Sequence, residues 1–598
     1  MQPTKRRPRV KTTVKRPVDD SISIGIDFGT TYSGIAWGYS REPEEIEIVT
    51  NWEAQFSRCS DVEKAPTQLL YDGDDAISWG YSIPADREAL KWFKLLLLRD
   101  ADITPEMAKS SQIQEARDLL EEINCDVIDA VAHFLNKLWA HALETIHRSV
   151  GPELLQKCRF HVVITIPAIW PPYAQQRMKQ AAMRAGILED RPCGETTLRF
   201  ITEPEAAALA TIKDLSKRST MKPGNTMVVC DAGGGTVDLI SYVVESVNPF
   251  TVRECVKGDG GLCGGMFLDE NFLRLIRRKV TPASWANVSK ARERKFLNDE
   301  WERGIKPQFS NQQRTWLVDL PDSCIMSNQN LKRRKTLEFS RSEILSVFTP
   351  IVDKIGALVS RQTQAIQAKY GKPADYIILV GGFGRSSYLY EKLKKSTGIT
   401  VLQSQGSKPW TAICRGAVVE SLSSHDLSTN LGLRIDARIA RSSYGVSFKT
   451  EYARTRHRVR DKKWSEEEQT WEAHNQMKWF LREGNNMSTK KPVREEYYRL
   501  FDEDADDDGT AQVSDTIYHC SAFPPPKAIG PTVEKLCEIF WTQDVDLESL
   551  PTWTNPQGKV FRQLNYEIEM SCDDGIVGFA VYFEGNRVGS RHIKVNFQ

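Results

Sequence analysis

The sequence predicts an α/β protein with two related lobes, followed by a region rich in β-strands. The first observation is an apolar, strand-like run at 21–25 that leads into Asp27-Phe-Gly-Thr-Thr-Tyr. The second is the return of this design at 227–230, which precedes Asp231-Ala-Gly-Gly-Gly-Thr-Val-Asp. The third is an alternation of helix-like and strand-like patterns from about 20 to about 430, which then gives way to strand-like stretches alone. A strand that ends in an acidic, Gly-rich turn is typical of a nucleotide-binding lobe, and its repetition predicts a duplicated one.

The remaining elements follow from the same periodicities. Residues 116–150 have apolar side chains at helical spacings, which predicts a helix. Residues 376–380 form a third apolar, strand-like run, which ends in a turn that contains Gly381 and Gly382. Beyond 430, the stretches 566–570 and 578–583 alternate as strands do, and no long helical pattern follows them. We therefore expect a two-lobed, nucleotide-binding domain over 21–430, a linker at 426–430 and a β-rich domain over 431–598.

Composition narrows the class of partner. The 598 residues include 80 Lys plus Arg and 79 Asp plus Glu, so the formal charge is +1 and no specific nucleic-acid partner is expected. The 12 cysteines form no CxxC pair, which suits a reducing compartment and predicts a cytoplasmic or nuclear location. No apolar run approaches the roughly 20 residues that span a bilayer, so no membrane partner is expected.

The first residues differ from the rest of the chain. Residues 1–18 hold Lys and Arg side chains without any acidic residue. We expect 1–20 to be a disordered, solvated basic leader. A nuclear-localisation signal or a patch for anionic surfaces is the alternative.

Two glycine turns carry the chemistry. Phosphates need close approach by backbone amides, which glycine permits, and a hydrated magnesium ion needs carboxylates. One turn follows Asp27 and the other follows Asp231, with Asp238 just beyond the second. The turn residues are Gly29, Thr30 and Thr31 in the first, and Gly233, Gly234, Gly235 and Thr236 in the second. Together they predict a site for a nucleoside triphosphate.

Several segments resemble a known family. DFGTTYSG at 27–34, DAGGGTVD at 231–238 and VGGFGRS at 380–386 are similar to the phosphate-1, phosphate-2 and adenosine motifs of the actin-like ATPase superfamily. VVITIPAIW at 162–170, FITEPEAAALA at 200–210, GGLCGGMFLDENF at 260–272 and CRGAVVESL at 414–422 resemble the heat-shock protein 70 family, in its atypical member 12 branch. The resemblance covers about 20–430. It implies duplicated ribonuclease-H-like lobes, with ATP or ADP and magnesium as cofactors.

The resemblance also implies roles for individual residues. Asp27 and Asp231 would hold magnesium through water, and Glu203 would orient the attacking water or the water shell of the metal. Lys94 is the candidate lysine for the γ-phosphate, with Lys91 as its competitor. Thr30, Thr31 and Thr236 would lie beside the β- and γ-phosphates, and Arg385 would stack on the base. The further expected nucleotide contacts are Gly29, Tyr32, Gly233, Gly234, Gly235, Gly264, Gly265, Glu302, Lys306, Gly381 and Gly382.

The chain departs from the family pattern at several positions. Met266 and Phe267 stand where two carboxylates are usual, Trp410 replaces an acidic residue, and Phe383 and Pro307 are also atypical. We therefore expect nucleotide binding with slow ATP hydrolysis. The alternatives are a nucleotide-sensing scaffold with little turnover and a small-molecule kinase on the same fold.

The C-terminal region resembles the family only faintly. SYGVSF at 443–448 is similar to the start of a peptide-binding β-sandwich, so a degenerate substrate-binding domain for unfolded or regulatory protein clients is one interpretation. A helical lid is not expected.

Two weaker patterns favour ordinary surface roles. Asp504, Asp506, Asp508 and Gly509, with Asp515 as the closing ligand, match part of a calcium loop, but a solvated acidic hairpin is favoured. The four arginines at 454, 456, 458 and 460 would line one face of a strand, and a charged solvent face is favoured over a binding site for RNA or an acidic partner.

Overall fold

The structure is a computed structural model. It describes residues 20–54, 61–72, 75–84, 87–103, 108, 110–168, 170–216, 221–247, 250–327, 336–404, 406, 408–423, 433–440, 442–488, 492–502, 510–511, 513–541, 545–573 and 576–594. The leader up to residue 19, the expected linker at 426–430 and the run from Asp504 to Gly509 lie outside these ranges.

Lobe I is built on a mixed sheet with the strand order β3-β2-β1-β8-β9, and β4 pairs with β2. Strand β1 runs antiparallel to β2 and parallel to β8. Helices α3 and α5 pack on the face that Ile22, Ile24 and Ile26 present. The strands are β1 (Ser21–Asp27), β2 (Tyr32–Tyr39), β3 (Glu47–Ile48), β4 (Ala65–Pro66), β8 (Arg159–Ile166) and β9 (Thr197–Thr202), and the two helices are α3 (Val127–Val150) and α5 (Pro172–Arg184).

Lobe II repeats this plan. Its sheet has the order β16-β15-β10-β11-β12-β17-β21, and β10 runs antiparallel to β11 and parallel to β15, as β1 does to its neighbours. The predicted duplication is thus present in the backbone. The strands are β10 (Thr226–Ala232), β11 (Val237–Val247), β12 (Phe250–Gly261), β15 (Tyr376–Val380), β16 (Thr400–Gln403), β17 (Leu433–Ile439) and β21 (Asn486–Ser488).

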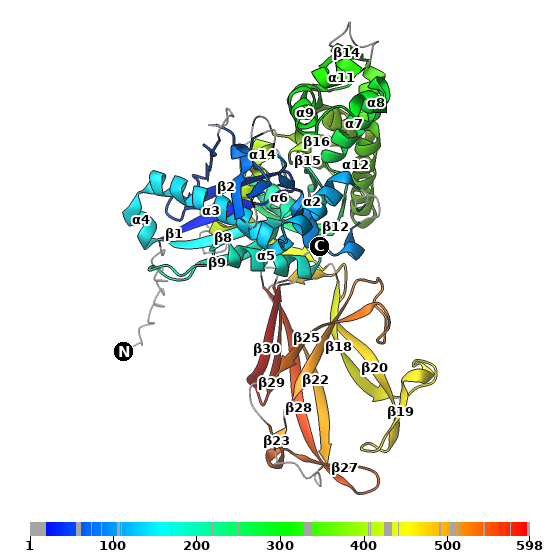
Figure 1. Cartoon of the computed structure of the whole chain (residues 1–598). Helices are drawn as coiled ribbons and strands as arrows, with labels where there is room; N and C mark the ends of the chain where they lie inside the picture. Colours follow the sequence, from blue (N-terminus) through cyan, green and yellow to red (C-terminus); the bar gives the residue numbers. More distant parts are fainter. Residues whose placement is uncertain are drawn as a thin grey trace, which may run out of the picture.

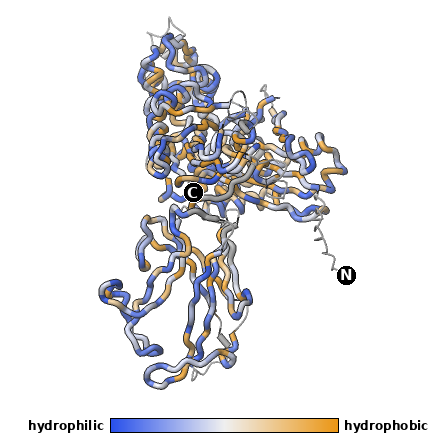
Figure 2. Tube along the Cα trace, turned by 180° about the vertical axis from the view of Figure 1, so that it is seen from behind, coloured by the Kyte–Doolittle hydropathy of each residue, from blue (hydrophilic) through white to orange (hydrophobic). Residues whose placement is uncertain are grey.

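Two helices, α6 (Glu203–Ser216) and α14 (Lys408–Leu422), lie between the sheets of the two lobes. They approach so closely that a Cβ on Gly416 would lie 1.7 Å from the carbonyl oxygen of Ala206. The outer face of the lobe II sheet is covered by α7 (Met266–Val280), α12 (Arg341–Tyr370) and α13 (Ser387–Thr397). Figure 2 shows apolar stretches alternating with hydrophilic ones along the chain in these lobes.

Smaller elements complete the lobes. Lobe I adds β5 (Gln68–Asp72), β6 (Asp75–Trp79), η1 (Gly80–Ser82), β7 (Leu90–Lys91), η2 (Phe93–Leu97), η3 (Asp100–Asp102), α2 (Ser111–Glu122) and α4 (Pro152–Lys157). Lobe II adds α8 (Pro282–Trp285), α9 (Lys290–Phe296), the π-helix η4 (Leu297–Ile305), α10 (Lys306–Gln308), β13 (Trp316–Asp319), α11 (Asp322–Ser327), β14 (Thr336–Phe339) and η5 (Phe383–Arg385).

The C-terminal region forms two five-stranded antiparallel sheets below the lobes in Figure 1. One sheet has the order β19-β20-β18-β24-β25, and the other has the order β22-β28-β29-β30 with β27 paired to β28. Among the described residues after Leu433, the helical elements are two short 3-10 turns, so the expectation of a β-rich region without a helical lid is confirmed. The elements are β18 (Ser443–Glu451), η7 (Val459–Asp461), β19 (Lys462–Ser465), β20 (Thr470–Leu481), β22 (Val493–Asp502), β23 (Thr510–Ala511), β24 (Ser514–Cys520), β25 (Val533–Phe540), β26 (Val545–Asp546), η8 (Leu547–Ser549), β27 (Thr552–Thr554), β28 (Val560–Asp573), β29 (Ile576–Phe583) and β30 (Asn586–Lys594).

Two details differ from the sequence patterns. The long helical pattern at 116–150 is two helices, because Asn124 adopts a left-handed conformation (φ 48°) and the side chain of Asp126 caps the start of α3. The alternating arginines lie in a turn and a 3-10 helix, where Arg458 donates to Asp461 and to the carbonyl oxygen of Ile529 at 2.9 Å. A strand would have exposed all four on one face.

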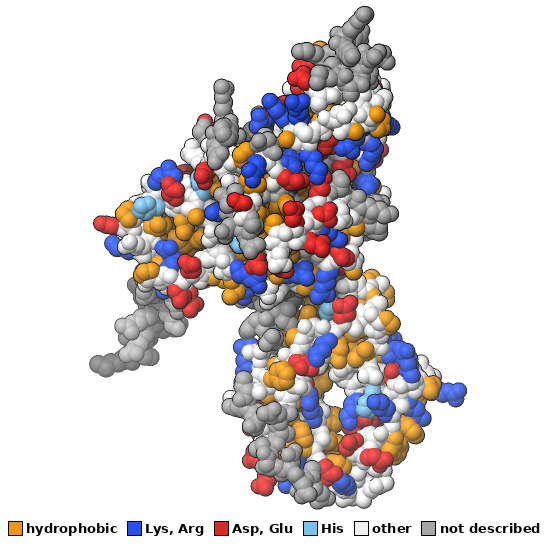
Figure 3. Space-filling model, viewed as in Figure 1, with side chains coloured by type: hydrophobic (Ala, Val, Ile, Leu, Met, Phe, Trp, Pro, Cys, Tyr) orange, Lys and Arg blue, Asp and Glu red, His pale blue; other side chains and the backbone are white. Residues whose placement is uncertain are grey.

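The surface agrees with the balanced composition. Figure 3 shows acidic and basic side chains interspersed over the lobes on the face displayed. Within the ranges given above, the structure contains no helix with the length and apolar character needed to cross a membrane.

Candidate functional site

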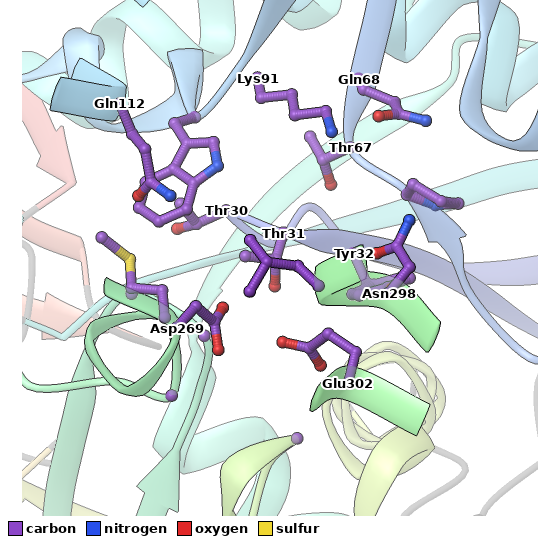
Figure 4. Close-up of a pocket in the computed structure, with 18 of the residues that line it drawn as sticks. Thr30, Thr31, Tyr32, Thr67, Gln68, Lys91, Gln112, Asp269, Asn298 and Glu302 are labelled. Atoms are coloured by element: carbon purple, nitrogen blue, oxygen red, sulfur yellow. The ribbon is translucent and has the colours of Figure 1, made fainter. Parts of the chain in front are cut away.

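A cleft of about 1680 Å³ lies between the two lobes and is lined by both predicted glycine turns. Ligand pockets usually hold about 300–1,000 Å³, so a nucleoside triphosphate has ample room. Figure 4 shows Thr30, Thr31 and Lys91 from lobe I facing Asp269 and Glu302 from lobe II.

The two turns meet at the centre of this cleft. A Cβ on Gly234 would lie 2.4 Å from Thr31 Oγ1, and a Cβ on Gly235 would lie 3.1 Å from Thr30 Oγ1. Any side chain at Gly234 would therefore require Thr31 to shift. Glycine at this position allows the backbone of lobe II to reach the hydroxyl groups of lobe I.

The second turn also supports the start of α7. The backbone N–H of Gly264 donates to the carbonyl of Gly235 at 3.1 Å, and the N–H of Gly265 donates to that of Gly233 at 3.0 Å. A Cβ on Gly264 would lie 2.3 Å from the carbonyl oxygen of Gly234. Gly265 thus lines the cleft, and Gly264 packs on the turn behind it.

The third glycine turn follows β15. Gly381 has a positive φ of 87°, and a Cβ there would lie 2.3 Å from Asp231 Oδ1. A Cβ on Gly382 would lie 2.6 Å from the ring of Trp410. This turn therefore closes over Asp231 on one side and over Trp410 on the other.

Four buried carboxylates surround the meeting point of the turns: Asp27, Glu203, Asp231 and Asp238. Burial raises the pKa of Asp231 well above its usual value, and the negative charge of Glu203 adds to this effect. Burial and Glu203 also raise the pKa of Asp238 to about 7. Asp231 Oδ1 accepts no hydrogen bond from the residues that the structure describes. The cluster is thus short of positive charge and of hydrogen-bond donors.

Lys94 supplies part of that charge. It lies on η2, and its Nζ is 2.6 Å from Glu203 Oε1 with both side chains buried. The aromatic rings of Phe28 and Trp170 flank the ammonium at 5.7 and 5.4 Å. Burial raises the pKa of Glu203, and Lys94 opposes the shift. The segment around Lys94 is a two-residue strand, β7, followed by the 3-10 helix η2.

Its competitor, Lys91, also lines the cleft, but it makes no ion pair within the described ranges. Burial lowers the pKa of Lys91 to about 8, and the nearby positive charge of Arg294 contributes. The structure thus separates the two candidates: Lys94 pairs with Glu203, and Lys91 presents a less basic amine to the cleft.

Lys64 was not among the predicted site residues. Its ammonium forms an ion pair with Asp27 Oδ2, and both side chains are buried. The antiparallel pairing of β4 with β2, in which Ser33 lies opposite Ala65, brings Lys64 to the cleft. No sequence motif marks this lysine, because its position depends on a two-residue strand.

Asp269 was also missed. Lys306, at the start of α10, donates to Asp269 Oδ1 at 2.8 Å and to Glu302 Oε1 at 2.5 Å, and Trp301 Nε1 donates to Asp269 at 2.7 Å. Burial and Glu302 raise the pKa of Asp269 to about 8, and Lys306 opposes this. The predicted residues Glu302 and Lys306 therefore meet, around a carboxylate in a segment that the sequence suggested had lost its acidic residues.

Aromatic side chains form another wall of the cleft. The rings of Tyr32 and Trp410 lie 5.3 Å apart between centroids and meet edge to face. The guanidinium of Arg385 lies 5.8 Å from the centre of the Trp410 ring, and Lys64 Nζ lies 5.0 Å from it. Trp410 thus joins the adenosine motif to the phosphate turns.

The predicted magnesium ligands are not equivalent. Asp231 has a buried oxygen that accepts no hydrogen bond from the described part of the chain, which suits a hydrated cation. Asp27 is already paired with the Lys64 ammonium. A metal held through water between two free carboxylates does not fit this arrangement, because one of the two is neutralised by the chain itself.

Ion pairs also join the lobes at the rim of the cleft. Lys290 of α9 lies 3.3 Å from Glu88 and 3.4 Å from Glu115, and Arg294 lies 3.7 Å from Glu88. The Lys290, Glu88 and Glu115 side chains are at least half exposed. These contacts bridge lobe I and lobe II beside the cleft.

In the C-terminal region, Asp515 has a structural role. Its carboxylate accepts hydrogen bonds from Arg499 at 2.7 Å, Tyr566 at 3.0 Å and Trp541 at 3.1 Å. These contacts connect the two sheets. All three donors to the Asp515 carboxylate are protein side chains, which argues against the alternative in which Asp515 closes a calcium loop.

Comparison with known proteins gave matches over both regions. The family model described as Hsp70 protein matches residues 23–431, and a domain of unknown function matches 438–555. Human heat shock 70 kDa protein 12B is 26% identical over 485 residues, covering 65% of this chain and 67% of that protein. Human heat shock 70 kDa protein 12A is 24% identical over 531 residues, covering 73% of each. A mitochondrial-type heat shock protein 70 of Encephalitozoon hellem is 29% identical over 419 residues, covering 69% of this chain and 64% of that protein.

Proposed function

The chain belongs to the Hsp70 family, and from this premise we propose that it binds ATP and ADP in the cleft between its lobes and hydrolyses ATP slowly. The resemblance to the actin-like ATPase fold and to the member 12 branch is confirmed by the matches above. The observation that carries the proposal is the meeting of two glycine turns, one from each lobe, over four buried carboxylates.

Phosphate binding follows from the turns. The backbone amides of the two turns would surround the phosphate oxygens, with the hydroxyl groups of Thr30, Thr31 and Thr236 beside them. Gly381, Gly382 and Arg385 would border the adenosine, and the Lys306 group would contact the ribose. The contact of the turns across the cleft supports a ligand that bridges the lobes.

Hydrolysis would depend on positioning, because phosphoryl transfer needs little covalent chemistry from a protein. Glu203 is the group we assign to the attacking water, since it is buried among the other carboxylates. Lys94 fixes its carboxylate at 2.6 Å and would stabilise negative charge that develops nearby. Magnesium stays a prediction from the family resemblance, and no step is assigned to it because Asp27 is paired with Lys64.

A nucleotide-sensing scaffold with little turnover is the second candidate. It is favoured by the ion pair between Lys94 and Glu203, since Lys94 opposes the rise in the pKa of this carboxyl group that burial causes. Met266 and Phe267, which stand where the family usually has two carboxylates, favour the same candidate. In either case the C-terminal sheets would recruit an unfolded or regulatory protein without a helical lid, in the cytoplasm or nucleus.

The two candidates are separated by single-turnover hydrolysis, with protein in excess over radiolabelled ATP, after binding has been established by calorimetric titration. Slow phosphate release that Glu203→Gln abolishes would support the ATPase. Binding without release would support the scaffold, and absence of binding would exclude both. Glu205→Gln is the matched control, because this buried carboxylate lies on the same turn of α6 and does not line the cleft.

A further inference from the structure

We propose that the Lys64 ammonium is a resident counter-cation of the phosphate site, so that this chain binds nucleoside di- and triphosphates without a divalent metal ion. The inference rests on the proposed nucleotide binding and concerns the same cleft. It assigns to a side chain the charge that a metal would otherwise bring.

The position of Lys64 carries the first step. Its Nζ pairs with Asp27 Oδ2, directly before the first glycine turn, and the side chains are 7% and 3% exposed. A Cβ on Gly34 would lie 2.8 Å from Lys64 Cγ, so the opposing strand has no side chain where the lysine stem passes. The fold therefore accommodates a lysine whose charged end reaches the phosphate turns.

The charge balance carries the second step. Asp27, Glu203, Asp231 and Asp238 bring four buried carboxyl groups to the phosphate turns, and the ion pair of Lys94 is with Glu203. The Lys64 ammonium lies beside Asp27 and lines the cleft, so it supplies a second buried positive charge there.

Hydrogen-bonding capacity carries the third step. An ammonium has three donors, and Asp27 uses one of them in the structure. The other donors can reach phosphate oxygens beside the first turn. A divalent ion between Asp27 and Asp231 would have to displace this lysine, whereas metal-free nucleotide would leave the pair intact and gain a cationic contact.

The test measures affinity for ATP and ADP by calorimetry on the full chain, in magnesium and again in excess EDTA. For the unaltered chain we expect the dissociation constant to change by less than about tenfold when the metal is removed. Lys64→Gln should lose at least about 100-fold in EDTA and recover most of its affinity in magnesium, because Asp27 is then free for the metal. Lys257→Gln is the control, since it removes an ion pair with Glu483 away from the cleft.

The outcomes are distinct. Nucleotide binding by the unaltered chain in magnesium but not in EDTA would overturn the inference and leave the proposed function intact. Absence of binding in both buffers would overturn both. Equal affinities of Lys64→Gln and the unaltered chain in EDTA would also overturn the inference. If the melting temperature shows that Lys64→Gln does not fold, Asp27→Asn/Lys64→Gln, which removes both charges, takes its place and should bind weakly in EDTA.

Discussion

The buried pair of Lys94 and Glu203 should be one of the costliest contacts to break in the ATPase domain. Its atoms lie 2.6 Å apart, and the side chains are 1% and 9% exposed. Removing one partner of such a pair leaves an uncompensated buried charge, which costs about 3–5 kcal/mol of unfolding free energy. We expect this range for Lys94→Met and for Glu203→Gln at a slightly alkaline pH.

The cost of Lys94→Met should depend on pH. Without the lysine, the pKa of Glu203 rises further above its unfolded value, because burial already raises it and Lys94 no longer opposes the shift. A raised pKa of a carboxyl group contributes stability that is present at low pH and lost as pH rises. The variant should therefore approach the unaltered chain at acidic pH and diverge from it at alkaline pH.

The double variant Lys94→Met/Glu203→Gln should recover much of the loss. A Met side chain suits the space between the rings of Phe28 and Trp170, and a Gln carries no charge. The coupling energy should reach at least about 2 kcal/mol. Urea denaturation followed by tryptophan fluorescence measures it, using the transition that shifts when ATP is added.

Lys290→Met is the control for this cycle, because its pair with Glu88 is exposed and should contribute no more than about 1 kcal/mol. The reasoning fails if the buried single variants cost no more than this control. It fails equally if the effects of Lys94→Met and Glu203→Gln simply add.

Four further outcomes are expected. Gly234→Ala should lower ATP affinity at least about tenfold in calorimetry by pushing on Thr31, whereas Gly356→Ala, where a Cβ meets nothing within 4 Å, should not. The pKa of Asp238 is about 7 in the folded chain, against a usual value of 3.8. The protonated group therefore stabilises the fold at low pH, and this stabilisation is lost as the pH rises from about 4 to about 7. In urea denaturation, Asp238→Asn should abolish the decrease in unfolding free energy over this pH range. Lys91 has a pKa of about 8, so at mildly alkaline pH it should react with an acylating reagent before surface lysines do. Bound ATP should protect Lys91 from this reaction. If peptide mass mapping finds no protection, Lys91 lies outside the nucleotide site. Asp515→Ala should cost the C-terminal sheets about 2–4 kcal/mol, because Arg499 loses its buried acceptor; an unchanged urea transition would contradict this.

Local sequence was sufficient for much of the fold. The strands β1, β10 and β15 each combine an apolar run with a following glycine turn, and these two signals specify both the strand and its end. Periodicity could not reveal the break between α2 and α3, because apolar spacing continues across a left-handed Asn124. Tertiary pairing also adds β17 and β21 to the lobe II sheet, and short strands carry little pattern of their own.

The site residues could be predicted where a sequence motif specifies the backbone. They could not be predicted where the contacting side chain comes from a distant segment without a motif. Thr31 and Gly234 lie in motifs and meet in the structure. Lys64 reaches Asp27 through a two-residue strand, and Asp269 reaches Lys306 through the packing of α7 on the π-helix η4. The choice between Lys91 and Lys94 depends on which amine reaches Glu203, and only the tertiary structure contains that distance.

The ion pairs of the cleft differ in cost according to where they lie. Lys64 with Asp27 and Lys94 with Glu203 are buried beside the phosphate turns, so losing either partner is expensive. The pairs of Lys290 with Glu88 and Glu115 are exposed at the rim, where each contributes about 0–1 kcal/mol. If the lobes separated, the weak, exposed ion pairs at the rim would break first, and the buried pairs beside the phosphate turns would stay intact. A nucleotide could then enter or leave while the charges that receive its phosphates stay in position.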